Sequence, residues 1–339
     1  MSSSRQPKPP VDASPLSEAI ELVFQTKLPE RAGEPSLHDY YGDLRQPARL
    51  EKYVRYHKDM FRFAEFDPNG KKVLEVGSGF GLVLVWLAWS GARAHGVELV
   101  SWMVDDVRTY LPRLPVEIKN RITVRQGGAS ELPYDDSIFD LVLSIEALSH
   151  YLDYQPFLVE AHRVLRQGGK LLVVDGNNGL NPSTRRYCKR IWALHERDIV
   201  DQDDPWLFVP KRQRIIHESF PGLDASETHA LALRTAGMVR EQIDNAVQTY
   251  VDNGKLPQNT YKHGQLSVHP EHEMVMERLF NPFSLAREIR SHGFETRLQG
   301  YWGGASGRPI VRVANRLLAA MSPVAMPTAP SFRIVATKR

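Results

Sequence analysis

Two acidic residues and three glycines form the pattern with the clearest chemical use in this chain. Glu75 closes an apolar run, and Gly77, Gly79 and Gly81 follow it at alternate positions. A glycine turn between an apolar strand and an apolar helix is the layout of a nucleotide-binding crossover. Glu98 lies about 20 residues beyond the first glycine, where a carboxylate accepts hydrogen bonds from ribose hydroxyls. These residues predict a nucleoside-binding turn.

The spacing of the turn separates it from the dinucleotide-binding type. The dinucleotide pattern G-x-G-x-x-G places its third glycine at the position that Leu82 holds here. The chain reads E-x-G-x-G-x-G instead, which disfavours a nicotinamide oxidoreductase. This pattern resembles motif I of the class I S-adenosylmethionine-dependent methyltransferases.

Later segments extend the resemblance in the family's own order. They are the strand-like run 92–99, the run 121–126 with its continuation 127–134, the strand-like run 139–146 and the segment 163–175. The second resembles the adenine segment G-D-A-x-x-L-P, and the last resembles L-x-P-G-G-x-L-x-x-x-D of the ubiquinone-biosynthesis-like (type 11) branch. The resemblance implies an α/β fold: a Rossmann-like seven-stranded sheet with helices on both faces, plus a mainly helical lid insertion.

The resemblance also implies the cofactor, S-adenosyl-L-methionine, and the residues that bind it. They are Glu75, Gly77, Ser78, Gly79, Gly81, Glu98, Leu99, Ala129, Ser130, Ser144 and Ile145. The chain departs from the family at Gly128, where the adenine segment usually has Asp. We expect the lost acceptor to lower the affinity for the cofactor.

Methyl transfer from a sulfonium mainly requires that a nucleophile lie in line with the methyl carbon. An alcohol must also lose its proton, which calls for a base, whereas a neutral amine or thioether needs none. Relatives often carry a histidine at the bend after the fourth strand, so His150 is the first candidate, with Tyr151 and Glu146 as the others. His150 is also placed to cap a helix, and Glu146 to orient the strand end. Asp175 is a further possibility.

Bulk composition fits a cytoplasmic enzyme. The 339 residues carry a formal charge of only +3, which does not predict nucleic-acid binding. The single cysteine, Cys188, excludes an intrachain disulfide framework. No run approaches the roughly 18 apolar residues of a membrane span.

Composition and periodicity divide the chain into five parts. We expect a flexible segment at 1–36, cap helices at 37–69, the cofactor-binding core at 70–180, a substrate lid at 181–281 and the rest of the core sheet at 282–339. Helices are expected at 15–24, 49–63, 281–294 and 309–321, and a final antiparallel strand at 332–337. The helix at 309–321 is a candidate for core packing, a dimer contact or a substrate wall.

Several polar groups outside the motifs are candidates for substrate contacts. Tyr40 and Tyr41 either close the methionine end of the site or pack on the surface, and Asn177 and Asn178 either bind substrate or satisfy their own loop. The basic clusters of the lid either hold an acidic or carrier-linked substrate or form a solvated face; they are Arg185, Arg186, Lys189 and Arg190, then Lys211, Arg212 and Arg214.

A histidine-rich segment precedes the C-terminal part of the chain. His263, His269 and His272 lie there with Glu271 and Glu273. They lack a partner pair at an established ligand spacing, so no metal is predicted.

These features predict methyl transfer to a small molecule. The leading acceptor is a hydroxyl of a sugar, lipid precursor or secondary metabolite, and the alternatives are an amine or sulfur acceptor. A protein or RNA substrate would need an open basic groove in place of a lid. A non-catalytic scaffold that binds the cofactor is the remaining alternative, favoured only by Gly128.

Overall fold

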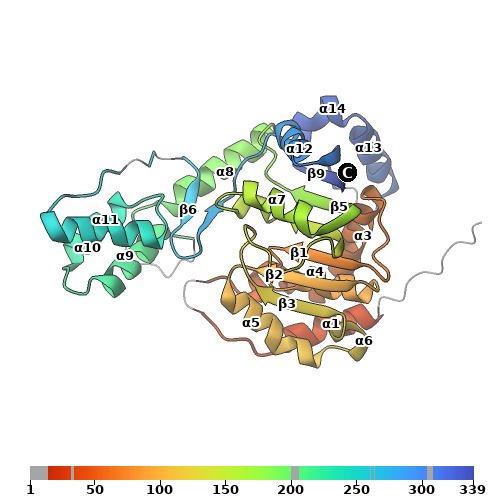
Figure 1. The fold of residues 1–339 in the computed structure, drawn as a ribbon, viewed down its shortest axis with the longest axis horizontal. Coiled ribbons are helices and arrows are strands. Elements are labelled where there is room, and N and C mark those ends of the chain that lie inside the picture. The colour runs from red at the N-terminus through yellow and green to blue at the C-terminus, as the bar shows by residue number, and fades with distance from the viewer. Residues whose placement is uncertain (1–13, 32–33, 200–205, 260, 263, 304–307) are drawn as a thin grey trace, which may run out of the picture.

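A computed structural model describes residues 14–31, 34–199, 206–259, 261–262, 264–303 and 308–339. Its centre is a seven-stranded sheet with helices on both faces (Figure 1), in the spatial order β3-β2-β1-β4-β5-β9-β8. The strands are β1 (Lys72–Val76), β2 (Arg93–Glu98), β3 (Ile122–Gln126), β4 (Phe139–Ile145), β5 (Leu165–Asp175), β8 (Phe294–Tyr301) and β9 (Ser331–Lys338). Strand β9 runs antiparallel to both of its neighbours, and the other pairings are parallel. The predicted sheet is confirmed.

The order of the strands fixes where a ligand binds. From β1 the chain moves outward to β2 and β3, then returns to the other side of β1 as β4. Ligands of open α/β sheets bind beyond the carboxyl ends of the strands at such a reversal. The glycine turn follows β1 at this edge, Glu146 follows β4, and Asp175 ends β5. Tyr301 ends β8 at the same edge, because β8 and β5 both run antiparallel to β9.

Each face of the sheet packs against its own set of helices. The first face is covered by α1 (Ser14–Phe24), α3 (Pro47–Phe63), α4 (Leu82–Trp89), α5 (Ser101–Tyr110) and α6 (Val116–Lys119). The second face is covered by α7 (Gln155–Val164) and α12 (Pro282–Ser291). Helix α4 is apolar throughout and nearly all buried, because the sheet lies on one side of it and α1 and α6 on the other. This packing holds the glycine turn, which begins α4, in a fixed position.

Short elements connect the main ones. They are α2 (Leu37–Tyr41), η1 (Gly42–Arg45), η2 (Leu111–Arg113), η3 (Leu148–His150), α14 (Ser322–Ala325) and η4 (Met326–Thr328). The predicted helix at 309–321 is α13 (Pro309–Ala320), and the predicted final strand is β9. Within the described ranges, no helix has both the length and the apolarity to cross a bilayer.

A helical lobe stands apart from the sheet (Figure 1). Helix α8 (Pro182–His195) leads out of the core to α9 (Phe208–Ser219), α10 (Ala225–Arg234) and α11 (Arg240–Asn253), and the hairpin of β6 (Ser267–His269) and β7 (Met274–Met276) leads back. The three outer helices share a hydrophobic cluster of their own that includes Ile215, Leu231 and Ile243. Residues 1–13 of the N-terminal segment, and His263, lie outside the described residues.

Candidate active site

Close packing explains two of the three glycines in the turn. Gly77 has φ 78°, and a Cβ there would lie 2.6 Å from the Cβ of Ala147 after β4. Gly81 has φ 71°, and a Cβ would lie 2.7 Å from the Tyr110 hydroxyl oxygen. A side chain at either position would push the turn away from the neighbouring elements. The turn is therefore held against β4 and α5.

Gly79, the middle glycine, faces open space. Its φ is 50°, and a Cβ there would meet nothing within 4 Å. Its N–H donates to Oε2 of Glu98 at 2.8 Å, and the N–H of Val100 donates to Oε1 at 3.0 Å. Two backbone donors thus fix the Glu98 carboxylate at the carboxyl end of β2, beside an open cradle. The predicted ribose-binding position and the glycine turn come together here.

Glu75 lies beneath this turn with an unused acceptor. The residue is 2% exposed, and its Oε2 has no hydrogen-bond partner among the residues that the structure describes. Burial, together with the nearby Glu98, raises the pKa of Glu75 well above its usual range. A buried carboxyl group without a partner is costly to maintain unless a ligand supplies one. An ammonium group next to the glycine turn would satisfy it.

Ser78 and the adenine segment lie on either side of this cradle. The Ser78 side chain is buried and points toward β2. A Cβ on Gly96 of β2 would lie 2.8 Å from Oγ of Ser78. On the other side, a Cβ on Gly128 would lie 3.6 Å from Oγ of Ser130 and 4.0 Å from Cδ1 of Leu99. These are ordinary contact distances, so the position has room for a side chain. Leu99 and Ser130 are exposed and Ala129 is half-buried.

The end of β4 carries Ser144, Ile145 and Glu146. Ser144 is fully buried, Ile145 is half-buried, and Glu146 adopts the left-handed conformation with φ 50°. Oε2 of Glu146 accepts a hydrogen bond from the N–H of Gly176 at 2.8 Å. Burial, and then repulsion from Asp175, raises the pKa of the Glu146 carboxyl, although solvent still reaches the side chain.

The hydroxyl of Tyr151 connects two strands. It donates to the carbonyl oxygen of Val76 at 2.9 Å and lies 3.4 Å from Oγ of Ser144. Burial raises the pKa of this phenol, so its ionised form is strongly disfavoured. In this environment Tyr151 is better suited to hold the end of β1 against β4 than to act as a base.

His150 has a defined orientation at the same edge. Its Nδ1 lies 3.2 Å from the carbonyl oxygen of Val275 in β7. Because a carbonyl only accepts, this contact assigns the proton to Nδ1 and leaves Nε2 with its lone pair. No sequence pattern indicated that the lid hairpin supplies this contact.

Asp175 holds the backbone around His150. Its Oδ2 accepts from the N–H of Ser149 at 3.1 Å, and its Oδ1 accepts from the N–H of Asn177 at 2.8 Å. The Asp175 side chain is fully buried, and burial raises its pKa. Asp175 therefore orders the loop that carries the candidate catalytic residues and connects it to the loop after β5.

The cap lies over the glycine turn. The ring centroid of Tyr40 is 6.0 Å from that of Phe80 inside the turn, and Phe80 is 5.7 Å from Trp102. Tyr41 is half-buried, and burial followed by the charge of Glu75 raises the pKa of its phenol. Tyr40 and Tyr41 therefore lie next to the glycine turn. This position agrees with the first of their two predicted roles, which is to close the methionine end of the cofactor site. The aromatic partners Phe80 and Trp102 escaped sequence analysis, because the motif fixes no residue type at either position.

Asn177 and Asn178 form hydrogen bonds within the protein, in contrast to the substrate-binding role considered for them. Nδ2 of Asn178 donates to the carbonyl oxygens of Met326 and Ala329 at 2.8 and 2.7 Å, and Asn178 is fully buried. Nδ2 of Asn177 donates to Oε2 of Glu277 at 2.6 Å. Glu277 thereby adds another carboxylate to this edge. No short sequence pattern relates Glu277 to Asn177, because the two residues are 100 positions apart.

The second basic cluster of the lid forms ion pairs within the protein. Nη2 of Arg212 lies 2.7 Å from Oε2 of Glu196, and both side chains are buried. Nζ of Lys211 lies 3.1 Å from Oε1 of Glu34 and 3.5 Å from Oε2 of Glu271. These pairs correct the expectation that this cluster holds an acidic substrate. The first cluster lies exposed on α8.

The histidine-rich segment lies next to an acidic residue from a distant part of the sequence. Glu34, from the N-terminal segment, meets His269, Glu271 and His272, with ligand atoms within 4.8 Å of one another. The ammonium of Lys211 and the guanidinium of Arg214, 3.1 Å from Glu271, already balance the two carboxylates. A divalent cation would add two positive charges without further carboxylates to balance them. We therefore propose no metal at this cluster.

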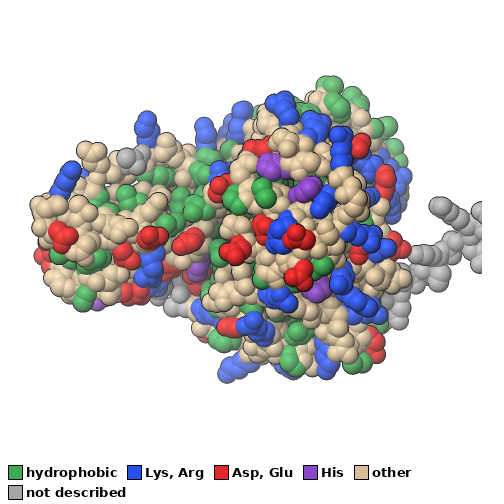
Figure 2. Space-filling model, viewed as in Figure 1, with side chains coloured by type: hydrophobic (Ala, Val, Ile, Leu, Met, Phe, Trp, Pro, Cys, Tyr) green, Lys and Arg blue, Asp and Glu red, His purple; other side chains and the backbone are tan. Residues whose placement is uncertain are grey.

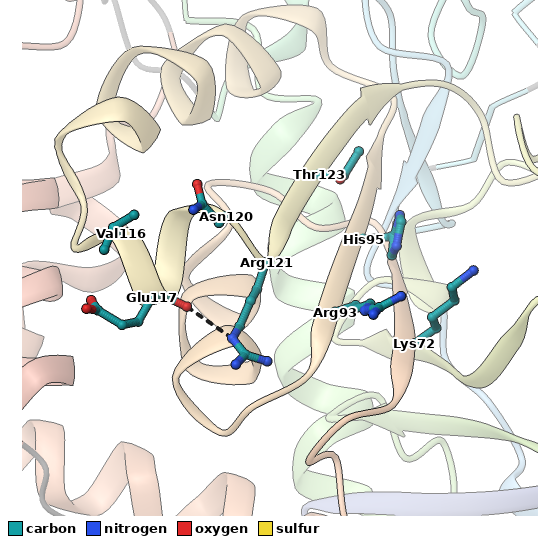
Figure 3. A pocket seen from close by; sticks show the side chains of 8 residues that line it. All are labelled: Lys72, Arg93, His95, Val116, Glu117, Asn120, Arg121 and Thr123. Atoms are coloured by element: carbon teal, nitrogen blue, oxygen red, sulfur yellow. Dashed lines mark hydrogen bonds between the residues drawn. The ribbon is translucent and has the colours of Figure 1, made fainter.

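A separate hollow of about 650 Å³ lies away from this edge (Figure 3). Lys72 and Arg93, the first residues of β1 and β2, line it together with Arg121 and the short helix α6. It therefore lies at the amino ends of the strands, opposite the glycine turn. Its position excludes it from the chemistry described above.

The strand order, the glycine turn and the carboxyl groups at the carboxyl edge are the features expected of a class I S-adenosylmethionine-dependent methyltransferase domain. The open face of Gly79 and the free acceptor of Glu75 fit a nucleoside with a cationic amino-acid tail. The carboxyl groups of Glu75, Glu146 and Asp175 have raised pKa values, and the positive charge of a bound sulfonium or ammonium group would favour their ionised forms.

Comparison with known proteins agrees with this assignment. Residues 74–173 match the family described as "Methyltransferase domain". The chain is 30% identical over 145 residues to a probable S-adenosylmethionine-dependent methyltransferase of Mycolicibacterium smegmatis, over 42% of this chain and 53% of that protein. It is 30% identical over 193 residues to erythromycin 3''-O-methyltransferase of Saccharopolyspora erythraea, over 54% of this chain and 57% of that protein. The matches thus span about half the length of these relatives.

A solved structure can also be superposed on the chain. It is the YcgJ protein of Bacillus subtilis, with a TM-score of 0.45 and 16% identity, over 85% of this chain and 98% of that one.

Proposed function

We propose that this protein transfers the methyl group of S-adenosylmethionine to a hydroxyl group of a small molecule, with His150 as the general base. The orientation of His150 carries the proposal. Its Nδ1 contact with Val275 leaves Nε2 free to accept a proton at the carboxyl edge of the sheet. Among the acceptors considered, a hydroxyl is the one that requires such a base.

The residues of the core would hold the cofactor by charge and by close backbone approach. Glu98 would accept hydrogen bonds from the ribose, Gly79 would leave room for the adenosyl and methionine groups, and Glu75 would face the ammonium group. Bound there, S-adenosylmethionine supplies an activated methyl group on sulfur. The protein then has to align the acceptor and exclude water.

His150 would accept the proton of the attacking hydroxyl at Nε2. Asp175 keeps the His150 loop in place through the N–H of Ser149. The similarity to erythromycin 3''-O-methyltransferase supports an oxygen acceptor.

We assign residues 37–69 to the cap, 70–180 to the cofactor core, 181–281 to the lid and 282–339 to the remainder of the sheet. The lid hairpin supports a small substrate, because β7 packs against η3 and supplies the carbonyl that orients His150. A lid in this position encloses the acceptor side of the crevice.

An amine acceptor is the second candidate. Glu146, Asp175 and Glu277 place three carboxyl groups on the acceptor side, and these groups would accept hydrogen bonds from a cationic substrate. The basic residues that would have favoured an acidic substrate are paired elsewhere, as shown for Arg212 and Lys211. An amine that attacks as the neutral base needs no proton acceptor in the transition state.

Activity of the His150→Gln variant distinguishes the two candidates. Formation of S-adenosylhomocysteine would be followed with a panel of hydroxylated and amine acceptors, at several pH values. Hydroxyl transfer predicts a fall in kcat of about 100-fold, with partial recovery at high pH where the acceptor ionises. Binding of S-adenosylmethionine serves as the control and should not change. An unchanged kcat on the best acceptor would contradict the assignment of His150 as base.

A further inference from the structure

Helix α13 and the short helix α14 expose a continuous apolar stripe. Ile310 is 79% exposed and Leu317 is 63% exposed, and Val313 and Met321 lie between and beyond them at spacings of three and four residues. Val324 in α14 is 80% exposed. Such spacing places these side chains on one helix face. Contiguous exposed apolar surface of this kind marks a binding surface more often than isolated exposed residues do.

The opposite side of the same segment attaches it to the sheet. Asn315 is the buried residue of α13, and Oγ of Ser322 accepts from the N–H of Gly300 in β8 at 2.9 Å. The buried amide of Asn178 binds the carbonyls of Met326 and Ala329 just beyond α14. The fold therefore holds this segment by its inner side and leaves the apolar stripe uncovered.

The charged residues of the segment itself are all of one sign. Arg312 and Arg316 lie exposed beside it on α13. No Asp or Glu occurs between Glu295 and the C-terminal Arg339. Figure 2 shows hydrophobic side chains over α13 and α14 with Lys and Arg side chains next to them. This combination of an apolar face with flanking arginines is characteristic of helices that lie in a membrane interface.

We propose that α13 and α14 form a binding surface for the headgroup region of an anionic lipid bilayer, which we name the interfacial segment. Ile310, Leu317 and Val324 would enter the acyl boundary, and Arg312 and Arg316 would contact lipid phosphates. A second copy of the chain fits less well. A symmetric pairing of two such helices would bring arginines together without a carboxylate from either segment, whereas anionic lipids neutralise them.

The interfacial segment is connected to the edge of the sheet that carries the crevice. Tyr301, the last residue of β8 before α13, lies at the carboxyl edge, and Asn178 follows β5 at that edge. Asn178 joins the loop after β5 to the end of the interfacial segment through its two hydrogen bonds. Attachment to a bilayer would therefore fix the orientation of the carboxyl edge of the sheet relative to the membrane surface.

Vesicle binding of the full chain tests the proposal without any methyl acceptor. The wild type would be sedimented with vesicles of equal parts phosphatidylglycerol and phosphatidylcholine, and with vesicles of phosphatidylcholine alone. We expect binding at least about tenfold stronger to the anionic vesicles, weakening with salt. The double variant Leu317→Glu/Val324→Glu should lose this binding. Its exposed positions make loss of the fold unexpected, and circular dichroism checks this.

Two matched variants separate the apolar and the charged contributions. Val251→Glu, at a half-exposed apolar position on α11, is the control and should bind vesicles as the wild type does. Arg312→Gln and Arg316→Gln should each weaken binding to anionic vesicles about fivefold.

Two outcomes would overturn the proposal. The first is a wild type that binds neither vesicle type, or a double variant that binds as well as the wild type. The second is a wild-type dimer in sedimentation velocity that Leu317→Glu/Val324→Glu converts to monomer without any vesicle binding, which would assign the stripe to a second copy.

Discussion

Buried charged side chains occur in both the cofactor core and the lid, but their partners differ. In the described part of the core, Glu75 keeps an oxygen without a hydrogen bond, and Glu98 accepts hydrogen bonds from the backbone N–H groups of Gly79 and Val100. In the lid, Arg212 pairs with Glu196 and donates through Nε to the carbonyl of Ala232 at 2.7 Å. The core thus retains acceptors for a ligand, whereas the lid uses its charges to stabilise its own packing. Substitutions in the two regions should therefore affect different properties.

Arg212→Met tests the structural role assigned to lid charges and should have the largest effect on stability. Removing one partner of a buried pair leaves the Glu196 carboxylate uncompensated, at a cost of about 3 kcal/mol. Hydrogen exchange of α9, α10 and α11 should become much faster, while the affinity for S-adenosylmethionine stays unchanged. Arg185→Met, on the exposed face of α8, is the matched control. Unchanged exchange in the lid would contradict the role given to this pair.

Glu75→Gln tests the opposite expectation for the core. The variant removes a buried carboxylate that lacks a partner, so we expect the free energy of unfolding at pH 7 to rise by on the order of 1 kcal/mol. Affinity for S-adenosylmethionine should fall at least about tenfold, because an amide carries no charge for the ammonium group. Denaturant unfolding and titration calorimetry measure the two effects separately. A variant that is less stable and binds normally would show that Glu75 serves the fold.

The pH dependence of this difference has a definite sign. Burial raises the pKa of Glu75 in the folded protein above its value of about 4.3 in the unfolded chain. The wild type therefore loses stability relative to the variant as pH rises above the unfolded pKa, and the difference vanishes in more acidic solution. A stability difference that stayed constant with pH would contradict the assigned pKa shift.

Gly128→Asp tests whether the departure from the family pattern weakens the cofactor site. A side chain fits there at ordinary contact distances from Ser130 and Leu99. A carboxylate would restore an acceptor for the adenine amino group, so we expect affinity to increase by about tenfold. Gly128→Ala, which adds volume without an acceptor, should leave affinity nearly unchanged. Equal affinities of Gly128→Asp and the wild type would show that the backbone already satisfies the adenine.

The sequence predicted the core well because its contacts are local to motifs. The pattern from Glu75 to Gly81, followed by Glu98, specifies a strand, a turn and a second strand end, and the parallel pairing of β1 with β2 brings them together. The sheet was predicted from the family resemblance, and the helix at 309–321 and the final strand were predicted from the periodicity of their apolar residues.

The lid and its contacts could not be predicted in the same way. Lys211 meets Glu34 across 177 residues, and His150 meets Val275 across 125, so no short pattern relates the partners. The hydrogen bond from Tyr151 to Val76 likewise depends on the pairing of β1 with β4. Charge clusters in a sequence do not show whether a neighbouring segment will neutralise them, which is why the substrate role considered for Arg212 was wrong.

Titration calorimetry of the Glu98→Ala variant with S-adenosylmethionine is the sharpest test of the assigned cofactor site. Two charge-assisted hydrogen bonds to ribose are worth roughly 3 kcal/mol together, so we expect binding about 100-fold weaker than for the wild type. Glu117→Ala, an exposed carboxylate on α6, should bind as the wild type does. Saturable wild-type binding that Glu98→Ala abolishes or weakens to this extent would support the cofactor site. Absence of wild-type binding, or equal affinity in Glu98→Ala, would contradict it.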